Sequence, residues 1–427
     1  MTGRLLRLIL IVVLLFAANA DAATSVPVIV KLLPGANLSL ISSLLGAAPV
    51  DSIPGANTYL LRLPSVPVLN TTLKLLGVEW IQANRGLGLP SVAHARLLSA
   101  TGVADPRWYR AQPAMGLIRS EAAHQYSDGR NILIADINSR VDTSHPALAG
   151  HIFSGYDFVS GTSSDVNAGL NDDQQTAGFL DDDQQTAGFL DDDQQTAGFL
   201  DGVGVSLFDD QQTAGFLDGH NPAYSHGTLC AGILVAVAPG AMIMPIRAFD
   251  DNGNADVFTL AKAIRWAADH NADIINMSFG TLQDSKVLAE AISYARNKGV
   301  LLVASAGNDN TSTPQYPAAY AGVMTVAATN LSDQKASFSN YGSNVVLDAP
   351  GVNVISAYPG GGYAMVSGTS FSAPEVAGEI ALILRLRTTG VASTADSTAV
   401  NVDSRNPDYY RKLGYGRIDS FRAVQAP

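Results

Sequence analysis

The chain has 427 residues, of which 47% are hydrophobic and 15% are charged. A chain of this length exceeds one average domain, so it predicts a large domain of roughly 250–300 residues together with smaller parts. The net charge of −12 argues against nucleic acid as a partner.

The N-terminal residues have the pattern of a secretory signal peptide. Arg4 and Arg7 precede an unbroken apolar run from Leu8 to Ala18, and small residues follow. A membrane anchor is the alternative, but the run is shorter than the roughly 20 residues that a span needs. We therefore predict a signal peptide over residues 1–22 and a secreted protein, periplasmic or extracellular, without a stable membrane anchor. Its single cysteine, Cys230, cannot form an internal disulfide.

Residues 26–86 predict a small α+β module. The segments VPVIVKLL and NTYLLRLP have the pattern of strands, and NLSLISSLLGA and VLNTTLKLLG have the pattern of short helices, with Pro and Gly at the joints. With its linker we assign this module to residues 23–104.

An acidic segment at residues 171–219 accounts for the whole charge imbalance. It contains 12 Asp and no Lys or Arg, arranged in four copies of a unit that ends in DDQQTAGFL. Clustered carboxylates could capture calcium, because hard cations prefer oxygen ligands. The spacing does not match an EF-hand loop, however, and a duplicated surface loop is the favoured interpretation, since loop entropy rises slowly with length.

The remainder, residues 105–427, alternates apolar strands with helical stretches. The strand-like segments include ILIAD, MIMPIRAF, ADIINMSF, GVLLVASAG and GVMTVAAT, and the helical ones include TLAKAIRWAADH and KVLAEAISYARNK. This alternation predicts a three-layer α/β domain with a mainly parallel sheet. Functional groups are then expected at the carboxyl ends of the strands.

Three polar residues stand out near predicted element ends. Ser370 begins a long apolar helix in which we expect Pro374 to lie in the first turn. A serine there suits a nucleophile that generates an oxyanion, although for such a serine taken alone capping is the more common role. His226 precedes Gly227, a small residue that allows another segment to approach closely, and could be a base or a structural histidine. Asn308 ends a strand, where an amide could donate to a negative oxygen.

Taken together, five motifs resemble the subtilisin-like serine proteases, or subtilases. In chain order they are ILIADINSRVDTSHP, SHGTLCAG, NMSFG, ASAGN and GTSFSAP, and the resemblance runs from about residue 111 to 423. It implies a subtilisin-like fold and peptide-bond hydrolysis. By the same resemblance the N-terminal module is similar to an inhibitory propeptide that self-cleavage removes.

The resemblance also implies a role for each matching residue. It gives the nucleophile as Ser370, the general base as His226 and the oxyanion donor as Asn308. The segment Ser278, Phe279 and Gly280 corresponds to the strand against which the substrate backbone pairs.

The first motif departs from the family at its most important position. Counting back from His145 and Pro146 puts Asn138 where the family has its catalytic aspartate. That acid accepts the Nδ1–H of the histidine, fixes its tautomer and stabilises the imidazolium, and changing it to an amide lowers turnover by about 10⁴ in a serine protease. Slow deamidation of Asn138 before Ser139 could regenerate the acid.

Asp136 is the nearest acid that could replace the missing carboxylate. Residues i and i+2 of a strand share a face, so its side chain points like that of Asn138 but lies about 7 Å further back. Direct contact with His226 would need a register slip, and we do not expect it.

The sequence thus predicts an exported serine endopeptidase that works through an acyl-enzyme at Ser370, with an activity that Asn138 is expected to lower. The alternative is a weak or inactive pseudoprotease that binds peptides or proteins. As a protease, the protein is expected to have two partners, a protein or peptide substrate and its own propeptide. The chemistry requires no cofactor or metal, and structural calcium is allowed, although Ala147 replaces one acidic calcium ligand of many family members. We expect Cys230 to be a buried packing residue.

Overall fold

The computed structural model describes residues 25–90, 94–99, 103, 105–161, 195–196, 199–200, 203, 206–207 and 224–427. The predicted signal peptide and most of the acidic repeat segment, with its calcium alternative, lie outside the described residues. Within these ranges, no helix combines the length and the apolar character that crossing a membrane requires. The chain divides into two units: Met1–Gly86 with Asp256–Lys262, and Leu87–Ala255 with Ala263–Pro427.

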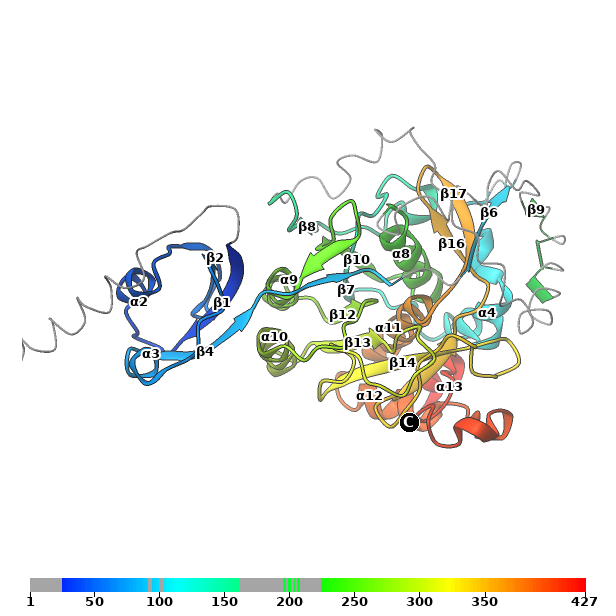
Figure 1. Ribbon diagram of the computed structural model, residues 1–427. Helices are drawn as coiled ribbons and strands as arrows, with labels where there is room; N and C mark the ends of the chain where they lie inside the picture. The colour runs from blue at the N-terminus through cyan, green and yellow to red at the C-terminus, as the bar shows by residue number, and fades with distance from the viewer. Residues whose placement is uncertain are drawn as a thin grey trace, which may run out of the picture. The chain divides into compact units, whose positions relative to one another are not determined.

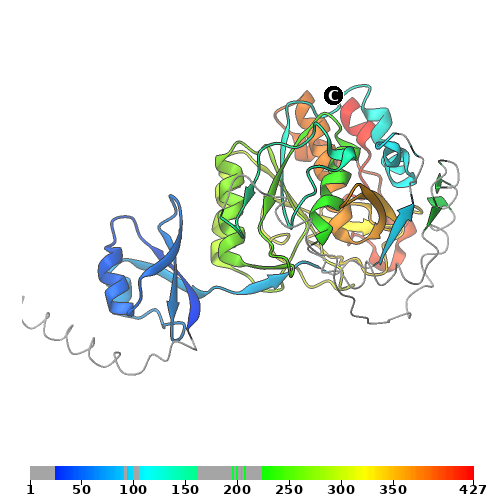
Figure 2. The ribbon, with the colours of Figure 1, turned by 90° about the horizontal axis from the view of Figure 1, so that it is seen from above.

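The first unit contains a four-stranded antiparallel sheet of order β2-β3-β1-β4 and two short helices. Its elements are β1 (Val26–Leu32), α2 (Leu38–Leu45), β2 (Pro49–Ile53), β3 (Thr58–Leu63), α3 (Thr71–Leu75) and β4 (Val78–Ala83). Asn37 and Asn70 cap the helices by accepting backbone N–H groups at 3.0 Å. Ile41 of α2 and Leu73 of α3 join one apolar cluster with the sheet, so both helices cover the same face (Figure 2). The predicted strands and helices are present, and the edge strands β2 and β4 were not predicted.

The second unit is built on a seven-stranded sheet in which every neighbouring pair is parallel, in the order β15-β14-β13-β12-β7-β10-β8 (Figure 1). Its strands are β7 (Leu133–Asn138), β8 (Tyr156–Asp157), β10 (Met242–Arg247), β12 (Ile274–Met277), β13 (Leu301–Ser305), β14 (Val323–Thr329) and β15 (Leu347–Pro350). Each strand segment predicted from the sequence is found in this sheet.

Smaller sheets and helices complete the unit, except that the first residue of β5, the last of β11 and the first half of α9 belong to the first unit. The order β16-β17-β6-β9 forms an antiparallel sheet, and β11 pairs with β5. These strands are β5 (Gly86–Gly88), β6 (His94–Ser99), β9 (Ser206–Leu207), β11 (Asn254–Asp256), β16 (Val354–Tyr358) and β17 (Gly362–Ser367). The helices are α4 (Pro113–Leu117), α5 (Ser120–Ala123), α8 (His226–Val237), α9 (Val257–Asp269), α10 (Lys286–Asn297), α11 (Thr369–Leu386), α12 (Val391–Thr398) and α13 (Ser420–Gln425).

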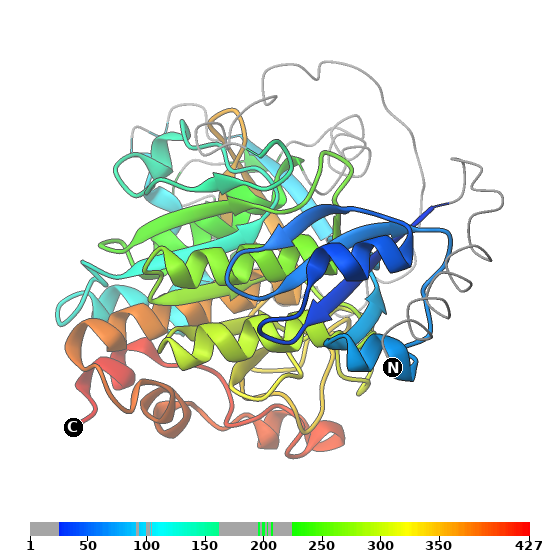
Figure 3. The same ribbon diagram turned by 90° about the vertical axis from the view of Figure 1, so that its left-hand side faces the viewer.

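Helices cover both faces of the parallel sheet, which confirms the predicted three-layer α/β architecture. Helices α8 and α11 lie on one face, and α10 with the second half of α9 lies on the other (Figures 1, 2 and 3). Every residue of α8 is buried, as are residues 369–383 of α11. The two helices pack tightly, because a Cβ built at Gly378 would lie 2.6 Å from the Cβ of Val237.

Strand β7 lies at the switch point of the sheet, where successive strands change from one side of β7 to the other. It lies between β10 and β12, and the chain forms β8 and then β10 on one side of β7 before it crosses to form β12 to β15 on the other. In open parallel sheets a crevice forms at the carboxyl end of the strands at such a switch point. Asn138, the last residue of β7, lies at this position.

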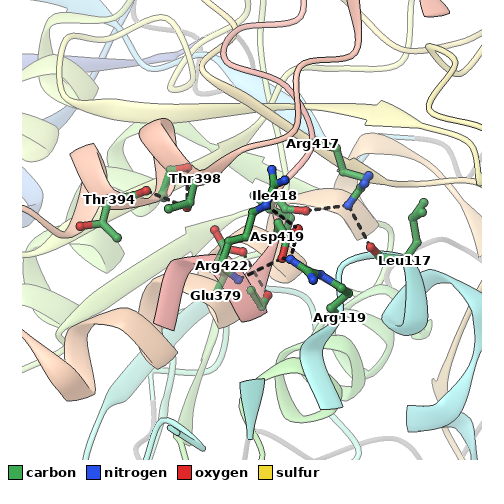
Figure 4. A network of polar contacts seen from close by, with 11 residues as sticks. Leu117, Arg119, Glu379, Thr394, Thr398, Arg417, Ile418, Asp419 and Arg422 are labelled. Atoms are coloured by element: carbon green, nitrogen blue, oxygen red, sulfur yellow. Dashed lines mark hydrogen bonds and ion pairs between the residues drawn. The ribbon is translucent and has the colours of Figure 1, made fainter. Parts of the chain in front are cut away.

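The C-terminal segment is held to α11 and to the α4–α5 region by buried and partly buried polar contacts (Figure 4). The Nε of Arg119 donates to Asp419 at 2.9 Å, and Arg417 donates to the carbonyl of Leu117 at 2.9 Å. The hydroxyl of Ser420 donates to the carboxyl group of Glu379 at 3.0 Å. Burial raises the pKa of Glu379 to about 8, so the folded protein favours its neutral form.

This raised pKa predicts a pH-dependent effect of Glu379→Gln on thermal stability. The contribution of Glu379 is fully present below its ordinary pKa of 4.5 and is lost as pH rises towards 8, because the buried group must then ionise. We expect the variant to raise Tm at pH 8 by several degrees and to change it little at pH 5. Thermal unfolding at both pH values measures this, with the exposed Glu121→Gln as the control. The same Tm change at both pH values would contradict the prediction.

Candidate active site

The end of β7 and the start of α8 approach each other closely. A Cβ built at Gly227 would lie 2.4 Å from the carbonyl oxygen of Arg140, so only glycine fits there. The N–H of Gly227 donates to Ser139 Oγ at 3.1 Å, and Thr228 Oγ1 accepts from the N–H of Asp142 at 2.9 Å. The predicted close approach beside His226 is therefore confirmed, and it brings His226 next to Asn138.

His226 and Asn138 form a direct hydrogen bond. The distance from His226 Nδ1 to Asn138 Oδ1 is 2.7 Å, and both residues are completely buried. An amide oxygen can only accept, so the ring must donate from Nδ1. In the neutral ring this leaves the lone pair on Nε2, which has no hydrogen-bond partner among the described residues. This is the tautomer that a general base needs.

The amide group of Asn138 is held at both ends. Its Oδ1 also accepts from the N–H of Ser139 at 2.9 Å. Its Nδ2 donates to the carboxyl group of Asp136, at 3.2 Å to Oδ2 and 3.5 Å to Oδ1. Asn276, opposite Asp136 in the β7–β12 ladder, donates to Asp136 Oδ1 at 2.8 Å. Asp136 thus reaches Asn138 rather than the imidazole.

Burial shifts the titration of the groups in this network. It lowers the pKa of His226 to about 4, because no carboxylate lies against the ring to favour its charged form. It raises the pKa of Asp136 to about 7, which the hydrogen bonds from Asn276 and Asn138 offset only in part. Burial also raises the pKa of Cys230 well above its ordinary value. Cys230 is fully buried and remains a thiol, in agreement with the predicted packing role.

Ser370 is the second residue of α11 and lies close to the same network. Cys230 Sγ is 3.5 Å from the Ser370 carbonyl oxygen and 3.8 Å from His226 Nδ1, so it lies between the two residues. The ring of Phe371 lies 5.8 Å from that of His226. The Ser370 hydroxyl donates to the Ser278 carbonyl at 3.3 Å, and it is not hydrogen-bonded to His226 Nε2.

Pro374 does not lie where the sequence predicted it. It is the sixth residue of α11 rather than part of the first turn, because the helix begins at Thr369. Proline lacks an N–H, so it cannot donate to the carbonyl four residues earlier, which belongs to Ser370. The hydroxyl of Ser278 donates to that carbonyl instead, at 2.9 Å. The proline therefore frees an acceptor that ties the Ser370 turn to the end of β12.

Asn308, after β13, faces the turn that leads into α11. Its Oδ1 accepts from both the backbone N–H and the hydroxyl of Thr369, at 2.9 and 2.8 Å. These contacts fix the orientation of the amide. Its Nδ2 would lie 3.4 Å from a Cβ built at Gly368, two residues before Ser370.

The segment Ser278–Gly280 follows β12 directly. Phe279 is fully buried against Phe249, with ring centroids 5.3 Å apart. A Cβ built at Gly280 would lie 2.5 Å from Gln315 Oε1, and one at Gly307 would lie 2.6 Å from it. Sequence reasoning missed Gln315, because the glycines that make room for its side chain lie far from it along the chain.

Three residues that the sequence singled out, His226, Asn138 and Ser370, meet at one place, and Asn308 adjoins the same turn. Sequence reasoning missed the contacts of Asp136 and Asn276. Over the described ranges, no group of three or more His, Cys, Asp or Glu side chains is positioned to hold a metal ion. The arrangement supplies a hydroxyl, a neutral imidazole and amide donors, which are the groups required for acyl transfer.

Comparisons with known proteins agree with this arrangement. Residues 129–416 match the profile of the subtilase family. Thermitase from Thermoactinomyces vulgaris is 30% identical over 333 residues, which cover 75% of this chain and 98% of thermitase. A thermostable alkaline protease from Halalkalibacterium halodurans is 44% identical over 167 residues, covering 37% of this chain and 46% of that protein.

A solved structure has the same fold. It is fervidolysin from Fervidobacterium pennivorans, described as a keratinolytic enzyme related to subtilisin. The match has a TM-score of 0.68 at 24% sequence identity and covers 96% of this chain and 62% of fervidolysin.

The pKa of His226 predicts the acid limb of the pH profile. A protonated imidazole cannot accept a proton, so kcat/KM should fall as pH drops through the pKa of about 4. In Asn138→Asp a carboxylate would stabilise the imidazolium and raise this pKa, so the acid limb should move to higher pH by about one unit or more. Peptide-anilide hydrolysis from pH 3 to 8 measures the shift, with the exposed Asn401→Asp as the control. An acid limb that stays in place in Asn138→Asp would contradict this account.

Proposed function

Because this chain belongs to the subtilase family of serine proteases, we propose that it cleaves peptide bonds through an acyl-enzyme on Ser370, with Asn138 in place of the acid that orients the base. The observation that carries the proposal is the 2.7 Å contact between His226 Nδ1 and Asn138 Oδ1. It supports a neutral His226 whose Nε2 is ready to accept a proton.

The proposed reaction follows from these positions. His226 Nε2 takes the proton of the Ser370 hydroxyl as its oxygen attacks the carbonyl carbon of the substrate. The Ser370 N–H and the Asn308 amide donate to the developing oxyanion. His226 then gives its proton to the leaving amine. Water attacks the acyl-enzyme carbonyl, His226 takes its proton, and the proton passes to Ser370 Oγ as the bond to the acid product breaks.

Asn138 sets the expected rate. Its oxygen selects the productive tautomer, as an aspartate would, but a neutral amide cannot stabilise the imidazolium that forms during attack. We therefore expect a slow endopeptidase, with turnover below that of the same site containing aspartate. A protein that only binds peptides would not need a correctly oriented general base, whereas this site has one in His226.

The substrate is proposed to bind as an added strand. The backbone after β12, at Ser278, Phe279 and Gly280, would pair with one side of an extended peptide. Within the second unit, the N–H of Leu89 donates to the carbonyl of Gly253 at 2.8 Å, beside β11. This contact supports the view that the backbone beside β11 accepts an extended segment of chain on the other side.

We also infer that the protein is exported and that its N-terminal module is a propeptide removed by self-cleavage. The signal-peptide pattern supports export, and the compact α+β fold of the first unit supports a separate module. The proposed peptide-bond hydrolysis requires no cofactor.

Labelling and hydrolysis together test the proposed function. The secreted protein, produced from the full chain and freed of its N-terminal module, should react with a fluorophosphonate at Ser370 and hydrolyse casein slowly, and Ser370→Ala should abolish both. Asn138→Asp should raise kcat by several orders of magnitude, up to about 10⁴. Absence of labelling and hydrolysis both in the protein with Asn138 and in the Asn138→Asp variant would contradict the proposal and favour a binding protein.

A control is needed for deamidation of Asn138, because a small aspartate fraction would imitate slow turnover. Peptide mapping by mass determines the residue at position 138. If the Asn138 form is active, the fluorophosphonate labels the whole population. Labelling confined to the deamidated fraction would show that Asn138 does not sustain catalysis.

A further inference from the structure

A buried acid lies directly behind the candidate active site. Asp136 is completely buried in β7, two residues before Asn138 and on the same face of the strand. A hydrophobic residue is the usual occupant of such a position, since parallel strands are covered on both faces. The carboxyl group of Asp136 instead accepts hydrogen bonds from Asn138 and Asn276, so it requires an explanation.

The contacts of Asn138 have a fixed direction. The amide presents its NH2 group to Asp136 and its oxygen to His226 Nδ1 and the Ser139 N–H. A 180° flip would turn the oxygen towards the carboxyl group of Asp136, where two acceptors would face each other whenever that group is ionised. It would also turn the NH2 group towards the N–H of Ser139. Asp136 and Ser139 thus favour the same amide orientation.

This orientation decides which imidazole nitrogen carries the proton. With the oxygen towards the ring, the proton lies on Nδ1 and the lone pair on Nε2. With the NH2 group towards the ring, Nδ1 would have to accept, and the proton would move to Nε2. In that state His226 could not take a proton from Ser370. An aspartate at position 138 has two equivalent oxygens and needs no such control.

We propose that Asp136 is a positioning residue that holds the Asn138 amide with its oxygen against His226 and thereby keeps the ring in the basic tautomer. The proposal rests on the catalytic roles proposed above for Ser370 and His226. It assigns Asp136 no contact with the substrate or with the reacting atoms. Burial raises the pKa of Asp136 to about 7, and the carboxylate that prevails above this value can only accept, so it favours this amide orientation most strongly there.

The test is a double-mutant cycle between positions 136 and 138 in the full-length protein. In the Asn138 background, Asp136→Val should lower kcat by roughly tenfold or more with little change in KM, because part of the population adopts the wrong tautomer. In the Asn138→Asp background, the same substitution should leave kcat unchanged or raise it, because two adjacent buried carboxyl groups no longer compete.

Two further variants keep the test falsifiable if Asp136→Val folds poorly. Asp136→Asn has the same shape but offers Asn138 either an oxygen or an NH2 group, so it should lower kcat less than valine does. Asp273→Asn is the matched control, because Asp273 accepts the N–H of Leu133 at 2.8 Å at the opposite end of β7. The control should leave kcat unchanged. Rates are normalised to the fluorophosphonate-reactive fraction.

The outcomes distinguish the positioning role from the proposed function. An equal loss of kcat in both backgrounds would mean that Asp136 is merely structural and would overturn the inference. Unchanged kcat for Asp136→Val in the Asn138 background would overturn it as well, while leaving the proposed function standing. Activity that is seen only with Asn138→Asp would overturn both. If no form labels Ser370, the catalytic roles themselves fail.

Discussion

The hydrogen bond between His226 Nδ1 and Asn138 Oδ1 is the interaction on which the whole site depends. A serine protease uses its acid for two separate purposes, to choose the tautomer of the base and to stabilise the imidazolium. Here the contact persists at 2.7 Å, but the partner is neutral. On the proposed mechanism the first purpose is retained and the second is lost. The low pKa of His226, about 4, expresses the same loss, because burial acts on the ring without a charge to oppose it.

The fold explains why these groups can meet at all. β7 lies at the switch point of the parallel sheet, and its last residue, Asn138, lies against the start of α8. Gly227 lets α8 begin against the backbone after β7, and Pro374 leaves the Ser370 carbonyl free to bind Ser278. The missing side chain of Gly227 leaves space for the backbone after β7. The missing N–H of Pro374 leaves a carbonyl oxygen that accepts a hydrogen bond from another segment.

Much of this arrangement could be predicted from the sequence. The buried strands are continuous apolar runs, and the order of the motifs identified His226, Ser370 and Asn308 before any geometry was known. The start of α11 could not be fixed in this way, because Pro374 is tolerated wherever the carbonyl it leaves unpaired finds another donor. The role of Asp136 was missed for a different reason. Strand spacing correctly kept it from the imidazole, but the intervening amide and the register that brings Asn276 opposite Asp136 are tertiary facts.

The most direct test of the account is the protonation of the His226 ring itself. We would measure the ¹⁵N signals of the imidazoles in the folded full-length protein at pH 6, and assign His226 by its loss in His226→Gln. The account predicts a neutral ring with its proton on Nδ1 and an unprotonated Nε2. A neutral ring with its proton on Nε2 would show that the Asn138 amide faces the opposite way, and that the base is not prepared to act.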